Sequence, residues 1–171
     1  MVAVKVAYVV NSPTGGATQG LFEFLKYARD VGGRPYLITP SPLSGAQRSS
    51  VLPFLEDVAV VPLTWWNRNV RVPLARRPLS WLAGNARTRF GSRAYGGITD
   101  ALRAWEVDIV HTHTSLILWG ALAARSLGIP HVWHVKESIG GEGYFKFWLP
   151  DRAIVSVIHR LSDRVLAMSA Y

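Results

Sequence analysis

The chain has 171 residues, of which 49% are hydrophobic, and it contains no cysteine. This size and composition indicate one folded domain, and they exclude a disulfide framework, thiolate metal sites and disorder over most of the length. The lack of cysteine fits a reducing cytoplasm. The N-terminal residues show no signal-peptide pattern, and the most apolar segment, Leu116–Ala124, is too short to span a bilayer.

The net charge of +8 is concentrated in one segment. Seven arginines lie between Val58 and Thr99, a stretch without Asp, Glu, Lys or His. The rest of the chain carries 12 basic residues (19 less these seven) and 11 acidic ones, so it is close to neutral. Such a segment attracts phosphate groups, whether they belong to lipids, nucleic acid or a charged substrate.

Strand and helix patterns alternate along almost the whole chain. The expected strands are Val4–Val10, Pro35–Thr39, Val58–Pro62, Val107–His111, His131–Val135 and Arg164–Met168. The expected helices are Leu21–Val31, Gln47–Leu55, one beginning near Pro78, Arg93–Trp105, Leu116–Leu127 with Ser115 as its N-cap, and Asp151–Leu161. The alternation predicts an α/β fold, a Rossmann-like doubly wound parallel sheet in a single domain over residues 1–171.

A glycine pair follows the first strand, in the loop Asn11–Ala17. Gly15 and Gly16 let the backbone approach a bound group closely and expose main-chain N–H donors at the start of a helix. Asn11 stands at the exit of the strand. This pattern is typical of a phosphate-binding turn, and the alternative is a tight turn with no ligand.

Four of the five histidines lie at the expected carboxyl ends of two strands, where parallel sheets bind ligands. His134 is a candidate catalytic base, and Lys136 and Glu137, which follow it, are candidate substrate- or donor-binding residues, as is Asn11. The alternative is that these histidines satisfy loop carbonyls. His111 and His113 should share one face of a strand, whereas His131 and His134 should point to opposite faces.

No metal site is predicted, because no nearby pair of histidines has a common zinc spacing. The chain also lacks G-x-x-x-x-G-K-[ST] and has no G-x-G-x-x-G after the first strand. Nucleotide hydrolysis and dinucleotide oxidoreduction therefore lose support.

Several segments together resemble one family. The run Val107–His113, the small-residue helix after it and Leu127–His134 are similar to the N-terminal half of GT-B glycosyltransferases of the GT4 type. The glycine loop with the following helix resembles that family's first βα unit, and Ala153–Ser169 resembles its last N-domain strand. The resemblance is weak between Ser41 and Thr99.

The resemblance implies one half of a two-domain enzyme that transfers sugar from a nucleotide sugar, with retention and without a metal or other cofactor. The acceptor, a glycan or a lipid-linked molecule, would bind this half. Gly15 and Gly16 would approach the donor diphosphate or the acceptor. His134 would contact the transferred sugar, and His113 would lie at the acceptor edge.

The family's E-x7-E signature belongs to the C-terminal, nucleotide-sugar-binding domain, and no two glutamates here are eight residues apart. The expectation is that this domain is absent from the chain, is supplied by the same or a separate polypeptide, and that the isolated chain is inactive. The alternatives are a non-catalytic subunit or membrane anchor of a split transferase, and a phosphate-ligand-binding domain unrelated to sugar transfer.

The segment at about 64–96 reads as a basic, aromatic insertion. A helix beginning near Pro78 would be amphipathic, cationic and tryptophan-bearing, which suits the surface of an anionic membrane. The alternatives are a helix packed on the sheet and, least favoured, a nucleic-acid contact. The expected location is cytoplasmic, peripheral to the membrane. The candidate membrane-binding residues are Trp65, Trp66, Arg76, Arg77, Trp81, Arg87 and Arg89.

Overall fold

A computed structural model describes residues 3–14, 16–68, 77–139, 146–147 and 149–168 of the chain. Of these, the side chains of residues 16–17, 67–68, 77–90 and 146 lie outside the description. The glycine-loop residue Gly15 and the arginine Arg76 are not among the described residues.

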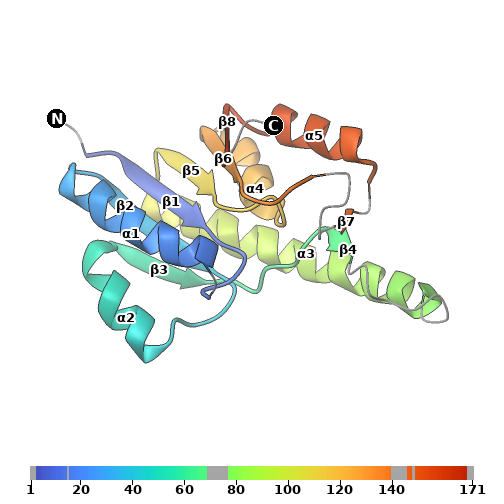
Figure 1. The fold of residues 1–171 in the computed structure, drawn as a ribbon, viewed down its shortest axis with the longest axis horizontal. Helices are drawn as coiled ribbons and strands as arrows, with labels where there is room; N and C mark the ends of the chain where they lie inside the picture. The colour runs from blue at the N-terminus through green and yellow to red at the C-terminus, as the bar shows by residue number, and fades with distance from the viewer. Residues whose placement is uncertain (1–2, 15, 69–76, 140–145, 148, 169–171) are drawn as a thin grey trace.

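The core of the fold is a six-stranded sheet in the order β3-β2-β1-β5-β6-β8 (Figure 1). Every neighbouring pair in it is parallel. Its strands are β1 (Lys5–Val9), β2 (Arg34–Thr39), β3 (Asp57–Val60), β5 (Ile109–Thr112), β6 (His131–Val135) and β8 (Arg164–Ala167). The order starts at β1 in the middle and runs outward on both sides, which confirms the doubly wound α/β fold.

Helices connect these parallel strands, as crossover geometry requires. They are α1 (Gly16–Asp30), α2 (Gly45–Val51), the 3-10 turn η1 (Leu52–Phe54), α3 (Arg77–Trp105), α4 (Trp119–Leu127) and α5 (Asp151–Arg160). None of the helices in the described part of the chain is long and apolar enough to cross a membrane.

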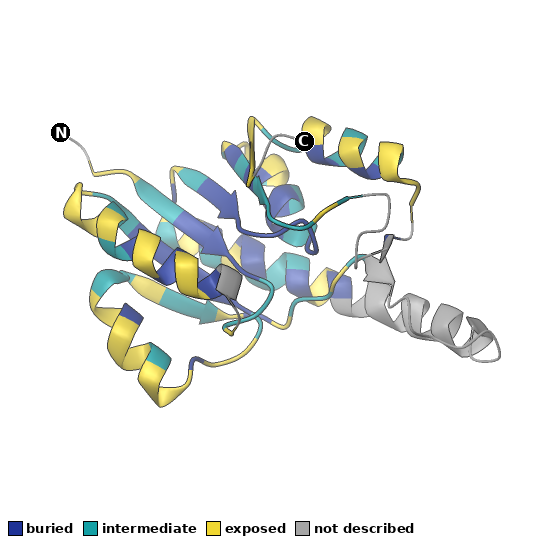
Figure 2. Cartoon of the chain, in the orientation of Figure 1, coloured by how far each residue is buried: buried dark blue, intermediate teal, exposed yellow. Residues whose placement is uncertain are grey.

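Each face of the sheet carries its own hydrophobic cluster, because residues alternate between the faces along a strand. Tyr8 and Leu37 pack with Leu21 and Leu25 of α1 on one face. The opposite face packs against α3 and α4, and farther along, Trp133 of β6 packs against α5. Figure 2 shows the buried residues along the central strands and the exposed residues on the outer sides of the helices.

Two glycines allow close packing on the α3 and α4 face. A Cβ atom on Gly120 of α4 would lie 2.5 Å from Thr112 Oγ1 and 3.2 Å from Val9 Cγ2. A Cβ on Gly91 of α3 would lie 2.3 Å from the Trp119 ring. Both positions therefore exclude a side chain on steric grounds, and α4 sits closer to the sheet than a larger residue would allow.

Three details differ from the sequence-based expectations. The helix expected near Pro78 and the one expected at Arg93–Trp105 form a single helix, α3. Ser115 is not an N-cap: α4 begins at Trp119, with Leu118 before it, and the Ser115 hydroxyl instead donates to Glu137. A small antiparallel sheet of β4 (Asn67–Arg68) and β7 (Lys146–Phe147) was not expected.

Candidate active site at the carboxyl edge of the sheet

The carboxyl ends of β1, β5 and β6 lie side by side, because these three strands are consecutive neighbours and all parallel. Asn11 follows β1, and Gly16 is the first residue of α1. His113 follows β5, and Lys136 follows β6. The structure thus brings the candidate residues from three separate segments to one edge of the sheet, while their roles toward a substrate remain predictions.

The loop between β1 and α1 is held by its own hydroxyl groups. Thr18 Oγ1 donates to the Ser12 carbonyl oxygen at 2.8 Å, and the Thr14 amide donates to Ser12 Oγ at 3.1 Å. The Gln47 side-chain amide of α2 donates to the Pro13 carbonyl. These bonds fix the approach of the chain to the N-terminus of α1, where free helical N–H groups favour an anion.

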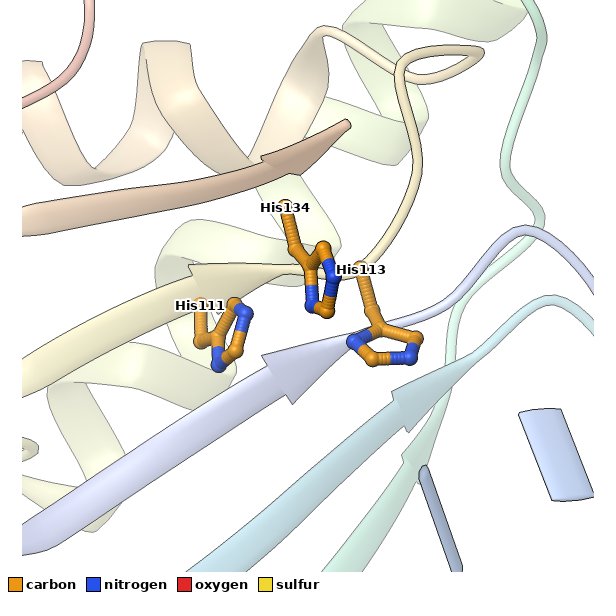
Figure 3. Close-up of side chains that lie close together, drawn as sticks. All are labelled: His111, His113 and His134. Atoms are coloured by element: carbon orange, nitrogen blue, oxygen red, sulfur yellow. The ribbon is translucent and has the colours of Figure 1, made fainter. Parts of the chain in front are cut away.

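Three histidines gather at this edge (Figure 3). His111 and His113 come from β5 and the residue following it, and His134 comes from β6. The His113 amide donates to the Val9 carbonyl at 2.9 Å, so the strand-like pairing with β1 continues past Thr112 and keeps His113 on the same face as His111. The ring centroids lie 5.6 Å apart for His111–His113, 5.7 Å for His111–His134 and 4.7 Å for His113–His134.

Burial keeps His111 and His134 of the cluster uncharged at neutral pH. Desolvation is the main cause that lowers the pKa of His111 to about 4, with smaller contributions from the charges of His134, His131 and Lys136. The pKa of His134 is also lowered, first by burial and then by Lys136, with Glu137 opposing. A neutral imidazole offers one N–H donor and one lone pair, which suits a hydroxyl group or a metal ion better than an anion.

Tyr8 closes one side of the cluster. Its ring lies 5.2 Å from that of His111 and 6.1 Å from that of Phe24 on α1. Burial raises the pKa of the Tyr8 hydroxyl to about 12, so the phenol stays neutral. The Tyr8 ring therefore contacts both His111 and Phe24 of α1.

Glu137 organises the chain after β5. Its carboxylate accepts hydrogen bonds from Thr114 Oγ1 at 2.6 Å, from the Ser115 amide at 2.6 Å and from Ser115 Oγ at 2.7 Å. Both carboxylate oxygens are therefore engaged within the protein. Glu137 positions the loop that follows His113, and a direct contact with substrate remains a prediction.

Lys136 is the cation nearest in sequence to His134. Its pKa is lowered, first by burial and against the opposing effect of Glu137. Its charge contributes to the lowered pKa of both His111 and His134. Lys136 therefore supplies positive charge to the edge and also disfavours protonation of the histidines.

His131 points to the opposite face, as the alternation along β6 predicts. Its Nδ1–H donates to the Leu161 carbonyl at 2.9 Å, since a carbonyl oxygen can only accept. Its Nε2 therefore accepts from the Thr112 hydroxyl at 2.8 Å. Both ring nitrogens are satisfied, so His131 joins β5, β6 and the chain before β8 and takes no part in the candidate site.

Trp66, one of the membrane-binding candidates, is half-buried, and its contact with a membrane remains a prediction. Its ring packs 6.1 Å from Trp133 and 5.4 Å from Phe147, and its indole N–H donates to the Ser115 carbonyl at 2.6 Å. Trp66 is a packing residue because its apolar surface and its polar atom both find partners inside the protein. Trp65 beside it is 39% exposed.

The other membrane-binding candidates are only partly placed. Arg77, Trp81, Arg87 and Arg89 all lie in α3, and their side chains are outside the described residues, as is the whole of Arg76. Their contact with a membrane remains a prediction.

An open groove of about 700 Å³ lies between α1 and α2. Glu23 and Lys26 line it and form an ion pair with each other at 2.8 Å. None of the three clustered histidines lines this groove. The titratable groups of the candidate site are therefore elsewhere, at the edge formed by β1, β5 and β6.

From the sequence, the histidines were compared only in pairs along the chain, and the cluster formed by three of them was missed. The missing signal was the register between strands: His111 lies opposite Val132, so His134 follows two residues farther along β6, on the face that His111 and His113 occupy. Side chains two residues apart on a strand lie on the same face. Aligning the two neighbouring strands and comparing the residues that share a face near their carboxyl ends could therefore have found the cluster.

Comparison with solved structures shows the same architecture in several other proteins. The chain is similar to MurG from Acinetobacter baumannii, with 15% identity and a TM-score of 0.58 over 97% of this chain and 42% of that one. A structure of UDP-N-acetylglucosamine 2-epimerase gives 15% identity and a TM-score of 0.60, again over 97% of this chain and 42% of that one. The SsfS6 glycosyltransferase from Streptomyces sp. SF2575 gives 18% identity and a TM-score of 0.51, over 91% of this chain and 43% of that one.

These similarities define the fold as a Rossmann-like lobe of the GT-B type. The sequence profile of Glycosyltransferase Family 4 matches residues 14–171, and the chain belongs to that family. A sequence search of the curated proteins finds no match. The chain spans less than half the length of the solved structures described above.

Proposed function

We propose that this chain is the acceptor-side lobe of a retaining, metal-independent glycosyltransferase that uses a nucleotide-sugar donor. The observation that carries the proposal is the meeting of Asn11, Gly16, His113 and His134 at one sheet edge in a member of Glycosyltransferase Family 4. A second lobe, in the same or a separate polypeptide, would bind the nucleotide. The reaction would take place between the two lobes.

Three groups at the carboxyl edge of the sheet could each bind a different part of the reactants. The N-terminus of α1 offers main-chain N–H groups to the donor diphosphate or to a phosphorylated acceptor. His134 is neutral at pH 7, so it can hydrogen-bond a sugar hydroxyl without bringing a charge to the anomeric carbon. Lys136 supplies a positive charge that favours the departing nucleotide diphosphate.

A nucleotide-release assay tests the proposed division of labour. The 171-residue chain, offered UDP-glucose, UDP-N-acetylglucosamine or GDP-mannose, should release no nucleotide above the buffer rate. Release should appear when the donor-binding lobe is supplied, and His134→Asn should then lower it by about 100-fold, the usual scale for a group acting at the reacting centre. Sugar transfer by these 171 residues alone would contradict the proposal.

We further propose that the acceptor is presented at an anionic membrane surface. The support is the seven arginines between Val58 and Thr99, together with the exposed Trp65. In vesicle flotation, the chain should rise with phosphatidylglycerol vesicles and remain at the bottom with phosphatidylcholine vesicles. Arg87→Ser with Arg89→Ser should reduce flotation. Equal flotation with both lipids, or with neither, would contradict membrane contact through these charges.

A further inference from the structure

The three histidines at the sheet edge are arranged as metal ligands are. Each of His111, His113 and His134 offers one ring nitrogen, and these three nitrogens all lie within 4.8 Å of one another. Figure 3 shows the three rings converging from β5 and β6. They are held by adjacent parallel strands, which are rigid supports for a ligand set.

The spacing of the rings fits a tetrahedral ion. With metal–nitrogen bonds of about 2.0–2.1 Å, the centroids of two imidazoles on a tetrahedral zinc ion lie roughly 5 Å apart. The observed centroid separations of 4.7, 5.6 and 5.7 Å bracket this value. On binding a tetrahedral ion, the ligating nitrogens would have to close to about 3.3 Å from one another.

Two ring nitrogens of the cluster, one on His111 and one on His134, also lack a hydrogen-bond partner among the described residues. Within the described part of the chain, His111 Nε2 and His134 Nδ1 are buried and form no hydrogen bond. A buried ring nitrogen without a partner costs free energy, so such atoms in a native protein point to a missing ligand. His131 serves as the internal contrast, because both of its nitrogens are hydrogen-bonded.

We propose that His111, His113 and His134 bind one divalent transition-metal ion of the zinc type, with a fourth position open to water. Three neutral imidazoles are the ligand set that zinc, cobalt and copper favour over magnesium or calcium, which prefer oxygen. The chain has no cysteine that could compete for the ion. The site is distinct in chemistry from the proposed sugar transfer, which needs no metal.

Metal binding and the proposed sugar contact use the same residue. When His134 coordinates a metal ion through its lone pair, that nitrogen cannot accept a hydrogen bond from a sugar. A bound ion would therefore inhibit transfer rather than assist it. The metal proposal itself does not depend on the transferase proposal, because it rests only on the ligand geometry and the unsatisfied nitrogens.

The test uses the 171-residue chain without an affinity tag, treated with a chelator and titrated with Co²⁺ and then Zn²⁺. We expect one equivalent of Co²⁺ to bind and to give the visible absorption of tetrahedral cobalt, with Zn²⁺ displacing it. Zinc should also raise the thermal midpoint, because a ligand that binds the folded state stabilises it. Failure of the wild-type chain to bind either ion at one equivalent would overturn the proposal.

Variants assign the ligands. His113→Asn and His134→Asn should each weaken zinc binding by at least about tenfold. The half-buried His134 keeps the test decisive if a change at buried His113 prevents folding, which circular dichroism would report. His159→Asn is the matched control, since His159 is exposed on α5. Binding that is lost in His159→Asn, or kept in full by folded His134→Asn, would contradict the assignment.

Because no nucleotide sugar is present, this test is independent of the transferase proposal. Zinc binding with no transfer by the two-lobed enzyme would refute only the proposed function. Transfer without zinc binding would refute only the metal site.

Discussion

His131 and His111 lie on neighbouring strands and on opposite faces of the sheet, and both are buried with the pKa lowered to about 4. They differ in their partners: His131 uses both ring nitrogens in hydrogen bonds, whereas His111 Nε2 has no partner among the described residues. Burial and a lowered pKa are therefore common to both histidines. Hydrogen bonding of the ring nitrogens is what distinguishes them.

The largest expected effect is on stability at His131. His131→Leu should cost about 3 kcal/mol of unfolding free energy, because it leaves the Thr112 hydroxyl and the Leu161 carbonyl buried without partners. His111→Leu should change it by less than about 1 kcal/mol, because it removes an unsatisfied atom. Urea unfolding of both variants measures the difference, and equal costs would break the comparison.

The pH dependence of stability should follow His131 and His111, because the pKa of each is about 4 in the folded chain. The pKa of His131 is about 4 in the folded chain and near 6.5 when unfolded, so the unfolded state binds more protons between these values and stability falls as pH drops through the window. One pKa unit corresponds to about 1.4 kcal/mol, so His131 contributes a loss on the order of 3 kcal/mol. Urea unfolding at pH 7, 5.5 and 4.5 tests this. The unfolding free energy should fall less steeply with decreasing pH in His131→Gln than in the wild-type chain.

A smaller effect is expected where α4 meets the strand that carries His111. Gly120→Ala should destabilise the fold by about 2 kcal/mol, because its Cβ would overlap Thr112 Oγ1, which is bonded to His131. Gly20→Ala in α1 is the control, since no atom lies within 4 Å of its Cβ position. That change should stabilise by about 0.5–1 kcal/mol through helix propensity. Thermal unfolding compares the two, and a neutral Gly120→Ala would show that α4 can move.

The smallest effect is expected at Glu137, which holds the loop beyond His113. Glu137→Gln should cost about 1 kcal/mol, because an amide replaces one carboxylate acceptor that receives two bonds from Ser115. Hydrogen exchange should report faster exchange of the Ser115 amide, with little change in β2. Unchanged protection at Ser115 would mean that the loop is held by other contacts.

The sequence predicts the main sheet well, because its strands are apolar runs separated by helices with strong periodicity. It fails where structure depends on partners far along the chain. The strands β4 and β7 have two residues each, and Asn67 of β4 pairs with Phe147 of β7, which lies 80 positions later (147 − 67). Ser115 looks like a helix cap but bonds with Glu137, and Trp66 looks like a surface residue but packs on Trp133.

The candidate site was predictable in its location but not in its composition. The carboxyl edge follows from the strand order, so His113, His134, Lys136 and Asn11 could be placed there from the sequence. The unsatisfied nitrogens and the convergence of three rings depend on the register between β5 and β6 and on the burial of the ring atoms. Neither the strand register nor the burial of these atoms can be deduced from a single amino-acid sequence.

We propose that this lobe receives its acceptor at the carboxyl edge of the sheet. Amide chemical shifts of the ¹⁵N-labelled chain, titrated with geranyl phosphate as a soluble lipid-phosphate probe, test it most directly. We expect the largest chemical-shift changes at the amides of Asn11, Gly16, His113 and His134. The His134→Asn change should reduce these chemical-shift changes. Changes centred on the α1–α2 groove at Glu23 and Ser50, with none at the edge, would contradict it.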